Sequence, residues 1–568
     1  MGLWCCLLVP PLVWLPGTGL ACAAEDPNEV VLLHAWEVDP DLDTQWYYGT
    51  PPNYIQSVDI DKLLQGDLQQ RVEEAQQIIV KANRGPVEDR RAVLDAVLDA
   101  LAQKEQNRVL RMVLVSAASS LVQDTEEAQR LWDALEGDAH ARRMVEPRLK
   151  DWKSQVALDR WRQVLAQPIA DVRYAITVLE GIAAVGSSAD ADLVRRVLLS
   201  DGAVLPVQLA AATSLGQLQT SGLEELAGAI ADSDIPRGKL LAVRLLARHT
   251  GSAAAARLNH IIDVGETAEQ SLAYQVLASV DASAALQRAE AMLEHPDSTA
   301  RRTAIDLLDA QQDVRSLNLQ AALLADRNVH IRRQVRENLR RKAAHPELRQ
   351  AVEDIVRFHL QGDRFEGIEQ AVVLVSQLQL HSLAPRLLEL VDHPREEVHV
   401  RAAWALQTLQ LQPEVLEAIS QRAERITARL ERDATMSFTE EITAAFLFEA
   451  LGRHRYRPAD RYLRKYIPKA DQKMRVITRT SAIYALGKIW EGSRDKGLAD
   501  KLAARMLDDN PLDPEEITVQ YASAIALGRI RHPSSIAQLE RVPDDPPIAR
   551  GVAAVWSIEQ IRQASDGE

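Results

Sequence analysis

The sequence is poor in cysteine, and its three cysteines, Cys5, Cys6 and Cys22, all fall within the first 22 of 568 residues. The rest of the chain therefore contains no thiol that could form a disulfide, bind zinc as a thiolate or act as a nucleophile. A zinc finger, a haem-attachment motif and a cysteine-protease mechanism are excluded for this part of the chain.

Catalytic motifs are missing as well. The sequence contains no GxSxG, HExxH, GxxxxGK[ST] or GxGxxG, the patterns typical of a serine nucleophile, a zinc protease and phosphate-binding loops. The 13 histidines are scattered, and no two of them share a helical face beside a third ligand. We therefore expect no catalytic residue, no metal site and no cofactor.

Aromatic residues make up only 4% of the chain, whereas Ala and Leu are abundant. This composition favours closely packed helices over sheets. The net charge of −15 argues against nucleic acid as a partner, because duplex binding depends on neutralising phosphates. After the first segment no run approaches the length of apolar sequence that crosses a bilayer, so the mature chain is not expected to span a membrane.

The first 27 residues, MGLWCCLLVPPLVWLPGTGLACAAEDP, have the form of a secretory signal: a short apolar core, then small residues, then acidic ones. Two processing sites remain open. Ala21-Cys22-Ala23 fits a signal peptidase that removes residues 1–23. Gly19-Leu20-Ala21-Cys22 is similar to a bacterial lipobox, which would place lipid on Cys22, although Gly19 departs from the usual aliphatic residue. Both predict an exported protein of the periplasm or cell envelope, lipid-anchored only in the second case.

What the sequence does contain is a repeat. A leucine column with a spacing of 31 residues in its regular part is found at Leu179, Leu215, Leu246, Leu277, Leu308, Leu339, Leu374, Leu406, Leu451, Leu486, Leu527 and, as isoleucine, Ile558. An alanine column lies four residues earlier, at Ala175, Ala211, Ala242, Ala273, Ala304, Ala402, Ala482 and Ala554. An acidic column lies fourteen residues before the leucine, at Asp201, Asp232, Asp263, Glu294, Asp392, Asp513 and Asp544.

Three columns in register predict stacked pairs of antiparallel helices. Residues four apart share a helical face, so a small alanine would allow close approach while the leucine fills the groove. The acidic residue lies at the junction between helices, where it could accept the free N–H groups of the next helix. The fold class predicted is therefore an all-α, right-handed solenoid.

These units resemble HEAT repeats, in particular the short bacterial form that also occurs in bilin (PBS) lyases. The resemblance rests on PVQLAAATSLGQL (206–218), DHPREEVHVRAAWALQTL (392–409), MRVITRTSAIYALGKI (474–489) and PEEITVQYASAIALGRI (514–530). It implies a ladder between acidic loop residues and arginines of the second helix, for which Arg173, Arg302, Arg333 and Arg401 are the candidates. Its structural positions include Asp232, Asp392, Arg401, Ala402, Leu406, Leu486 and Leu527.

The stretch 392–409 tests whether polar clusters in this chain are reaction centres or scaffolding. Asp392 and Pro394 are expected in the turn between two helices, and Trp404 as a filler between repeats. His393 and His399 are expected to have no fixed partners. The remaining apolar positions follow one helical face, so we interpret the stretch as scaffolding.

Along the chain, the predicted parts are a signal peptide (1–23), an atypical N-terminal cap (24–85), degenerate helical repeats (86–164), the HEAT-like solenoid (165–561) and a polar tail (562–568). An N-terminal cap is expected because a solenoid must cover its first apolar face. Within the cap, EVVLLHAWEV (29–38) fits either a strand or a short helix, and 60–82 fits one helix.

One segment departs from the acidic average. Residues 450–479 hold ten Lys and Arg against two Asp, with tyrosines between the basic residues. The simpler interpretation is a solvated outer face neutralised by acidic neighbours. The alternative is a binding patch for an anionic partner, comprising Arg453, Arg455, Tyr456, Arg457, Arg461, Tyr462, Arg464, Lys465 and Tyr466. A second basic run occupies 327–342.

The function expected is that of a non-catalytic, exported HEAT-repeat scaffold that binds protein partners over an extended surface. An accessory subunit or a lyase-like enzyme built on the same repeats is the alternative. The identity of the partner is not specified by the sequence.

Overall fold

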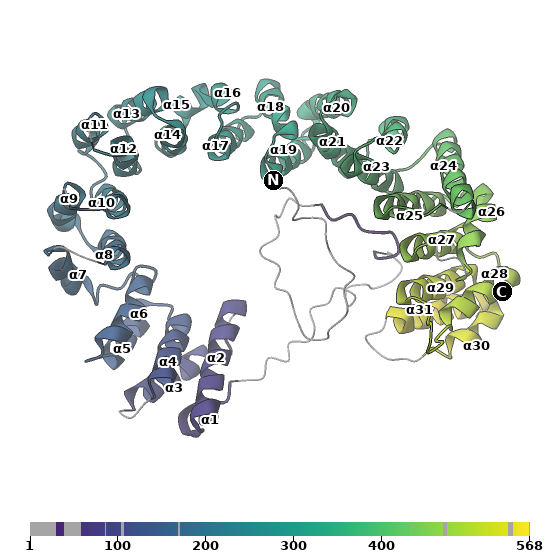
Figure 1. Ribbon diagram of the computed structural model, residues 1–568, viewed down its shortest axis with the longest axis horizontal. Coiled ribbons are helices and arrows are strands. Elements are labelled where there is room, and N and C mark those ends of the chain that lie inside the picture. Colours follow the sequence, from purple (N-terminus) through teal and green to yellow (C-terminus); the bar gives the residue numbers. More distant parts are fainter. Residues whose placement is uncertain are drawn as a thin grey trace. The chain divides into compact units, whose positions relative to one another are not determined.

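A computed structural model describes residues 30–38, 58–85, 87–103, 107–167, 171–200, 202–233, 235–432, 434–469, 474–542 and 549–566. Within these residues all regular secondary structure is helical, and successive helices run antiparallel in pairs (Figure 1). The predicted all-α solenoid is confirmed. The predicted signal segment and Cys22 lie outside the described residues.

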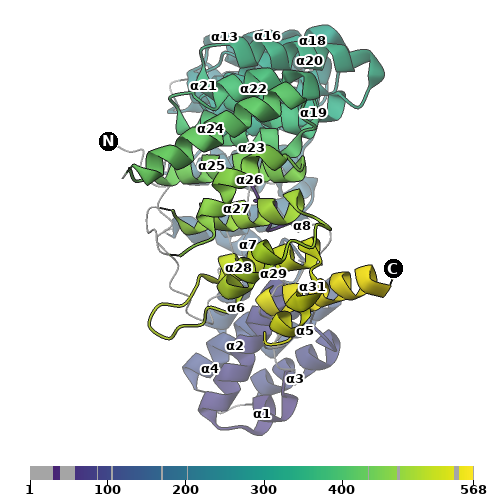
Figure 2. The same ribbon diagram turned by 90° about the vertical axis from the view of Figure 1, so that its right-hand side faces the viewer.

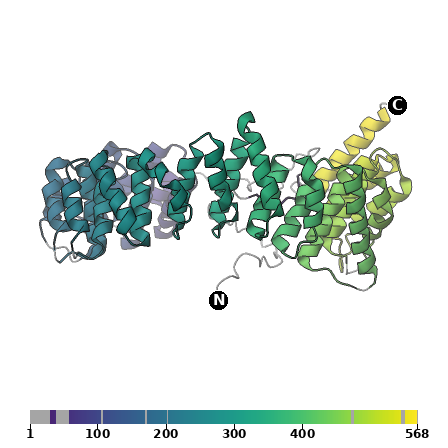
Figure 3. The ribbon, with the colours of Figure 1, turned by 90° about the horizontal axis from the view of Figure 1, so that it is seen from above.

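The chain divides into two compact units, Tyr48–Gln320 and Ala321–Glu568, and the second also includes Met1–Tyr47. We call them the N-terminal and C-terminal units. Each consists of two layers of helices, and we call the first helix of each pair an A helix and the second a B helix. The row of helix pairs is clear in Figure 2 for the C-terminal unit and in Figure 3 for the N-terminal unit.

In the N-terminal unit, the A helices are α1 (Ile60–Gln65), α3 (Arg90–Ala102), α5 (Thr125–Ala134), α7 (Leu158–Leu165), α9 (Ala191–Leu198), α11 (Glu224–Ala231), α13 (Ser252–Val264), α15 (Ala282–Gln287) and α16 (Ala289–Met292). The B helices are α2 (Leu68–Arg84), α4 (Arg108–Leu121), α6 (Ala139–Leu149), α8 (Val172–Val185), α10 (Leu205–Leu218), α12 (Gly238–Leu246), α14 (Thr267–Val280) and α17 (Ser298–Asp309). Helix α18 (Val314–Ala321) lies where the two units divide.

In the C-terminal unit, the A helices are α20 (Pro346–Gln361), α22 (Ala384–Leu390), α24 (Pro413–Glu431), α26 (Asp460–Leu463), α28 (Lys496–Met506) and α30 (Ile536–Leu539). The B helices are α19 (Val329–Lys342), α21 (Phe365–Gln377), α23 (Glu396–Thr408), α25 (Phe438–Arg453), α27 (Val476–Ile489), α29 (Ile517–Ile530) and α31 (Ala549–Asp566). Neighbouring B helices pack side by side, α23 on α25, α25 on α27 and α27 on α29.

The leucine and alanine columns form the seam between the B helices. All eleven leucines of the column are at most 3% exposed, and so are all eight alanines. Ile558 departs from the column because it is half-buried, whereas Ile561 of the same terminal helix is fully buried. The seam predicted from the sequence is therefore present in both units.

A glycine column, one residue after the leucine, brings B helices still closer together. A Cβ built on Gly452 would lie 2.6 Å from the Cα of Ala485, and one on Gly487 would lie 2.7 Å from the Cα of Ala526. A Cβ built on Gly528 would likewise lie 2.7 Å from the Cα of Ser557. Each glycine thus faces the residue that precedes the column position of the next B helix, and only hydrogen fits in this space.

The described members of the acidic column do not cap the following helices, contrary to the prediction. Asp263 pairs with Arg288 at 2.7 Å, and Asp392 pairs with Arg422, in each case an arginine of the following repeat's A layer. These carboxylates end an A helix several residues before the next helix begins, too far from its first N–H groups. Asp232 is exposed, while Asp201 and Asp544 lie outside the described residues.

The helix N-termini are capped by residues next to them instead. Asp297 accepts a hydrogen bond from the Thr299 amide at 2.6 Å. His393 was expected to have no partner, but its Nδ1 accepts a hydrogen bond from the Arg395 amide at 3.1 Å. The same His-Pro turn recurs at His295 and His532, so these histidines fix the path of the chain into a helix.

A further column, seven residues before the leucine, ties each B helix to the loop that leads into it. Its members donate hydrogen bonds to carbonyl oxygens of that loop: Arg301, Arg332, His399, Arg479 and Gln520. This column lies one residue before Arg302 and Arg333, which were predicted as ladder arginines. Arg401 bonds the preceding B helix at Glu369, at 3.0 Å, and not an acidic residue of the loop.

Two predictions for the N-terminal region are wrong. Residues 60–82 form two helices, because Gly66 and Asp67 interrupt them and the Asp67 side chain caps α2. Residues 30–38 form neither strand nor helix, and their only regular feature is a turn at 35–37. No helix among the described residues has the length and apolar character needed to cross a bilayer.

Candidate functional site

The predicted basic patch runs from the end of the B helix α25 at Arg453 to the A helix α26 and the turn after it. Most of its charges have acidic partners. Arg455 pairs with Glu491 at 2.5 Å, Arg461 with Glu424 at 2.6 Å and Lys465 with Glu431 at 2.6 Å. Arg464 bridges Asp460 and Asp495, at 2.7 and 2.9 Å. Arg453 donates to the Gln407 carbonyl, and Arg457 lies over the ring of Trp490.

The tyrosines of the patch face inward. Tyr462 and Tyr466 are at most 1% exposed. Their hydroxyl groups bond to Ser420 and Thr427 of α24, at 2.9 and 3.0 Å. Burial raises the pKa of Tyr466 to about 12. Both rings therefore join the A helices and are not available to stack on a ligand; Tyr456 alone is half-exposed. Partner binding by this patch stays a prediction.

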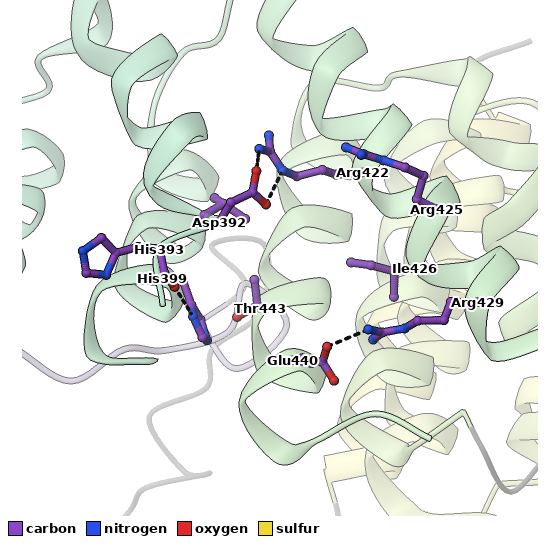
Figure 4. A pocket seen from close by; sticks show the side chains of 10 residues that line it. Asp392, His393, His399, Arg422, Arg425, Ile426, Arg429, Glu440 and Thr443 are labelled. Atoms are coloured by element: carbon purple, nitrogen blue, oxygen red, sulfur yellow. Dashed lines mark hydrogen bonds and ion pairs between the residues drawn. The ribbon is translucent and has the colours of Figure 1, made fainter. Parts of the chain in front are cut away.

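A cleft of about 360 Å³ opens between α24 and the loop that leads into α23 (Figure 4). Arg422, Arg425 and Arg429 come from one face of α24 and line one wall. Asp392 and Glu440 lie opposite, and Glu440 pairs with Arg429 at 2.8 Å. The pairing with Arg422 lowers the pKa of Asp392, so both carboxylates serve as partners of arginines.

The histidines of the cleft are engaged in the scaffold. His399 donates from Nδ1 to the His393 carbonyl at 3.0 Å, and His393 caps α23. Trp404, in the same helix, is 8% exposed, as expected of a filler. These contacts agree with the interpretation of 392–409 as scaffolding.

Residues 30–38 lie on the B layer of the C-terminal unit, against α25 and α27 (Figure 1). His34 Nδ1 lies 2.8 Å from Glu449 Oε1, and the Ala35 amide donates to Glu449 Oε2 at 2.8 Å. The Trp36 indole N–H donates to Ser481 Oγ at 3.2 Å. His34 and Trp36 are 8% and 6% exposed.

Glu449 is the centre of this site. Its side chain is fully buried in α25. Besides the two contacts from the segment, it accepts hydrogen bonds from Gln407 of α23 and Ser481 of α27, both at 2.6 Å. A buried carboxylate needs such donors, because an unpaired charge in the interior is costly. Three consecutive B helices and residues 30–38 therefore meet at one carboxylate.

Ring stacking adds shape to this polar contact. The His34 ring stacks between Trp36, at 5.5 Å, and Phe446 of α25, at 4.5 Å. A turn presents the two residues: the Glu37 amide donates to the His34 carbonyl, and the Glu37 carboxylate accepts from the His34 amide at 2.7 Å. The segment is thus bound by a compact His-Ala-Trp turn.

The site favours the charged imidazolium. Burial opposes the charge on His34, but the hydrogen bond to Glu449 and the nearby carboxylates of Glu37 and Glu441 outweigh it and raise the pKa of His34 above 6.5. Burial likewise raises the pKa of Glu441, against the opposing contributions of the Ile477 amide and Arg475. Protonation of His34 therefore strengthens the contact between the segment and α25.

Sequence reasoning missed Glu449 and residues 30–38 as a site. A signal was present in FLFEALG (446–452), where a lone glutamate interrupts an otherwise apolar stretch of a B helix. The His-Ala-Trp sequence lies in residues 29–38, for which the sequence pattern did not decide between a strand and a short helix. No cluster of three or more His, Cys, Asp or Glu side chains suited to a metal ion occurs among the described residues.

No protein-family model matches the sequence, and no curated protein matches it. Among solved structures, Kap95p in its complex with RanGDP has a TM-score of 0.49 at 14% identity, over 89% of this chain and 72% of Kap95p. Kap121p bound to Pho4p has a TM-score of 0.42 at 11% identity, over 90% of this chain and 55% of Kap121p. Yeast importin-beta (Kap95p) has a TM-score of 0.41 at 13% identity, over 88% and 72%. These proteins are similar in fold alone, and the assignment of a HEAT-like solenoid rests on the helix pairs and columns described above.

Proposed function

We propose that the chain is a non-catalytic HEAT-repeat scaffold that binds protein partners on the B layer of its C-terminal unit. An accessory or lyase-like enzyme remains the alternative from the sequence, but no contact described above favours it. We further propose that the protein is exported, in keeping with the signal-like first segment.

One observation supports the B layer as the binding surface. Residues 30–38 are not part of any helix pair, yet the B helices α25 and α27 hold them through Glu449, Phe446 and Ser481. The surface therefore already binds a short non-helical segment in a specific way, which is what recognition of a partner peptide requires.

Site-specific photo-crosslinking tests the surface. Phe438 and Ile517 begin the B helices α25 and α29 and are 56% and 52% exposed. Phe358 of the A helix α20 is 73% exposed and provides the matched control. With a photoreactive phenylalanine analogue at each position, we expect partner adducts at 438 and 517 and none at 358. Adducts at 358 alone would contradict the assignment of the B layer.

Mass spectrometry of the mature N-terminus tests export. A chain that begins at Cys22 with a diacylglycerol mass would establish a lipoprotein, and one that begins at residue 24 would establish cleavage after Ala23. Recovery of the intact Met1 terminus from the native cell would contradict export in either form.

A further inference from the structure

The B helices around Glu449 are buried on almost every side. Residues 443–452 of α25 and 478–487 of α27 are all buried. A helix at the surface of a solenoid normally keeps one polar, exposed face. Residues 30–38 lie against this side at Phe446, Glu449 and Ser481, so these helices are built to be covered there.

Residues 30–38 supply two of the four groups that hydrogen-bond to Glu449. The scaffold gives Gln407 and Ser481, and the segment gives the His34 ring and the Ala35 amide. Apolar contacts would cover the helices equally well. Buried polar contacts discriminate between ligands. A ligand without the matching donors would leave the Glu449 carboxylate short of hydrogen bonds, which is costly in the interior.

Within residues 30–38, the two buried side chains, His34 and Trp36, belong to this turn. Val31 and Val38, on either side of the turn, stay 61% and 45% exposed, so these two side chains gain little from burial. A ligand that makes the same contacts and buries more apolar surface would compete with the segment.

We propose that the Glu449 site is a peptide-recognition site that residues 30–38 fill in cis, and that a partner protein enters it by presenting an imidazole two residues before a tryptophan. This inference rests on the proposed function. It specifies what the partner must present to the same surface, and it identifies residues 30–38 as the segment that competes with the partner. The segment belongs to the same chain as its site, so its binding is intramolecular and competes with weak and unrelated ligands at any protein concentration.

A fluorescent peptide with the sequence of residues 30–38 tests the inference by anisotropy on the full-length protein. The double variant His34→Ala, Trp36→Ala should free the site, and we expect it to bind the peptide at least about tenfold more tightly than the unaltered protein. Adding Glu449→Gln to the double variant should abolish this gain. A peptide with alanine in place of tryptophan should not bind. Lys501→Ala, at an exposed position of the A helix α28, is the control and should change none of these values.

Equal binding of the peptide by the unaltered protein and the double variant would overturn the inference, as would binding that survives Glu449→Gln. Circular dichroism and hydrogen exchange of α25 show whether each variant is folded. Concentration-dependent dimers of the unaltered protein, lost in the double variant, would mean that the segment fills the site of a second copy and would also overturn it. Failure here, with crosslinks still obtained at position 438, would leave the proposed function standing.

Discussion

Replacing Gly487 with alanine tests how closely the B helices must approach. The added Cβ would lie 2.7 Å from the Cα and 2.8 Å from the Cβ of Ala526, whereas ordinary contact begins at 3.4 Å. Helices α27 and α29 would have to separate by about 0.7 Å at this point, the difference between 3.4 and 2.7 Å. Overpacking of this kind costs about 1–3 kcal/mol, and the higher helix propensity of alanine returns about 1 kcal/mol. We expect a net destabilisation of up to about 2 kcal/mol.

Gly497→Ala is the matched control. Gly497 lies in the exposed first turn of α28, and a Cβ there would meet only Asp495 Oδ1, at 3.4 Å. The same substitution should therefore stabilise the protein, by up to about 1 kcal/mol. Because a repeat array need not unfold in one step, native-state hydrogen exchange of the α27 and α29 amides is the appropriate assay. A Gly487→Ala variant whose α27 amides exchange no faster than those of the parent would refute the close-packing argument.

The other predictions concern buried charge, the seam and pH. Arg479→Met should destabilise the C-terminal unit by about 3 kcal/mol in urea unfolding, because it leaves the fully buried Glu515 with Arg505 as its remaining cation, at 3.3 Å; an unchanged midpoint would contradict this. Leu406→Asp places a charge in the seam and should cost several kcal/mol, so unchanged thermal melting would show that the face assignment is wrong. The pKa of His34 is raised, so its contribution to docking is complete below pH 6.5 and is lost as the pH rises through the docked-state value. Hydrogen exchange of residues 30–38, corrected for intrinsic rates, should therefore be faster at about pH 8.5 than at about pH 6, and the opposite order would contradict the ion pair with Glu449.

The seam of the solenoid could be predicted from the sequence because it repeats. A position such as Ala273 or Leu277 is constrained by the same neighbour in every repeat, so the spacing alone places it on a buried face. The glycine at Leu486-Gly487 belongs to the same kind of pattern and follows the leucine at four of its positions. The repeat spacing thus predicts the contacts between neighbouring B helices.

The candidate site could not be predicted in this way because it does not repeat. Glu449 occurs in one B helix only, and its partners come from α23, α27 and the N-terminal segment. Nothing in the pattern of residues 29–38 indicates which helix they contact. The contacts of the basic patch could not be predicted for a related reason: charge in a linear stretch does not show that Tyr462 turns inward or that Arg461 pairs with Glu424 of the preceding A helix.

The contact between His34 and Glu449 joins positions 415 residues apart. During synthesis from the N-terminus, the His-Ala-Trp turn emerges long before α25 and α27 exist, and loop closure over such a distance comes late in folding. Until α25 and α27 have been synthesised, the turn has no surface to bind. A chaperone or translocation factor that shields it until the last repeats assemble would act on a stretch of fewer than ten residues. Any truncation that removes α25 would leave the turn exposed for good.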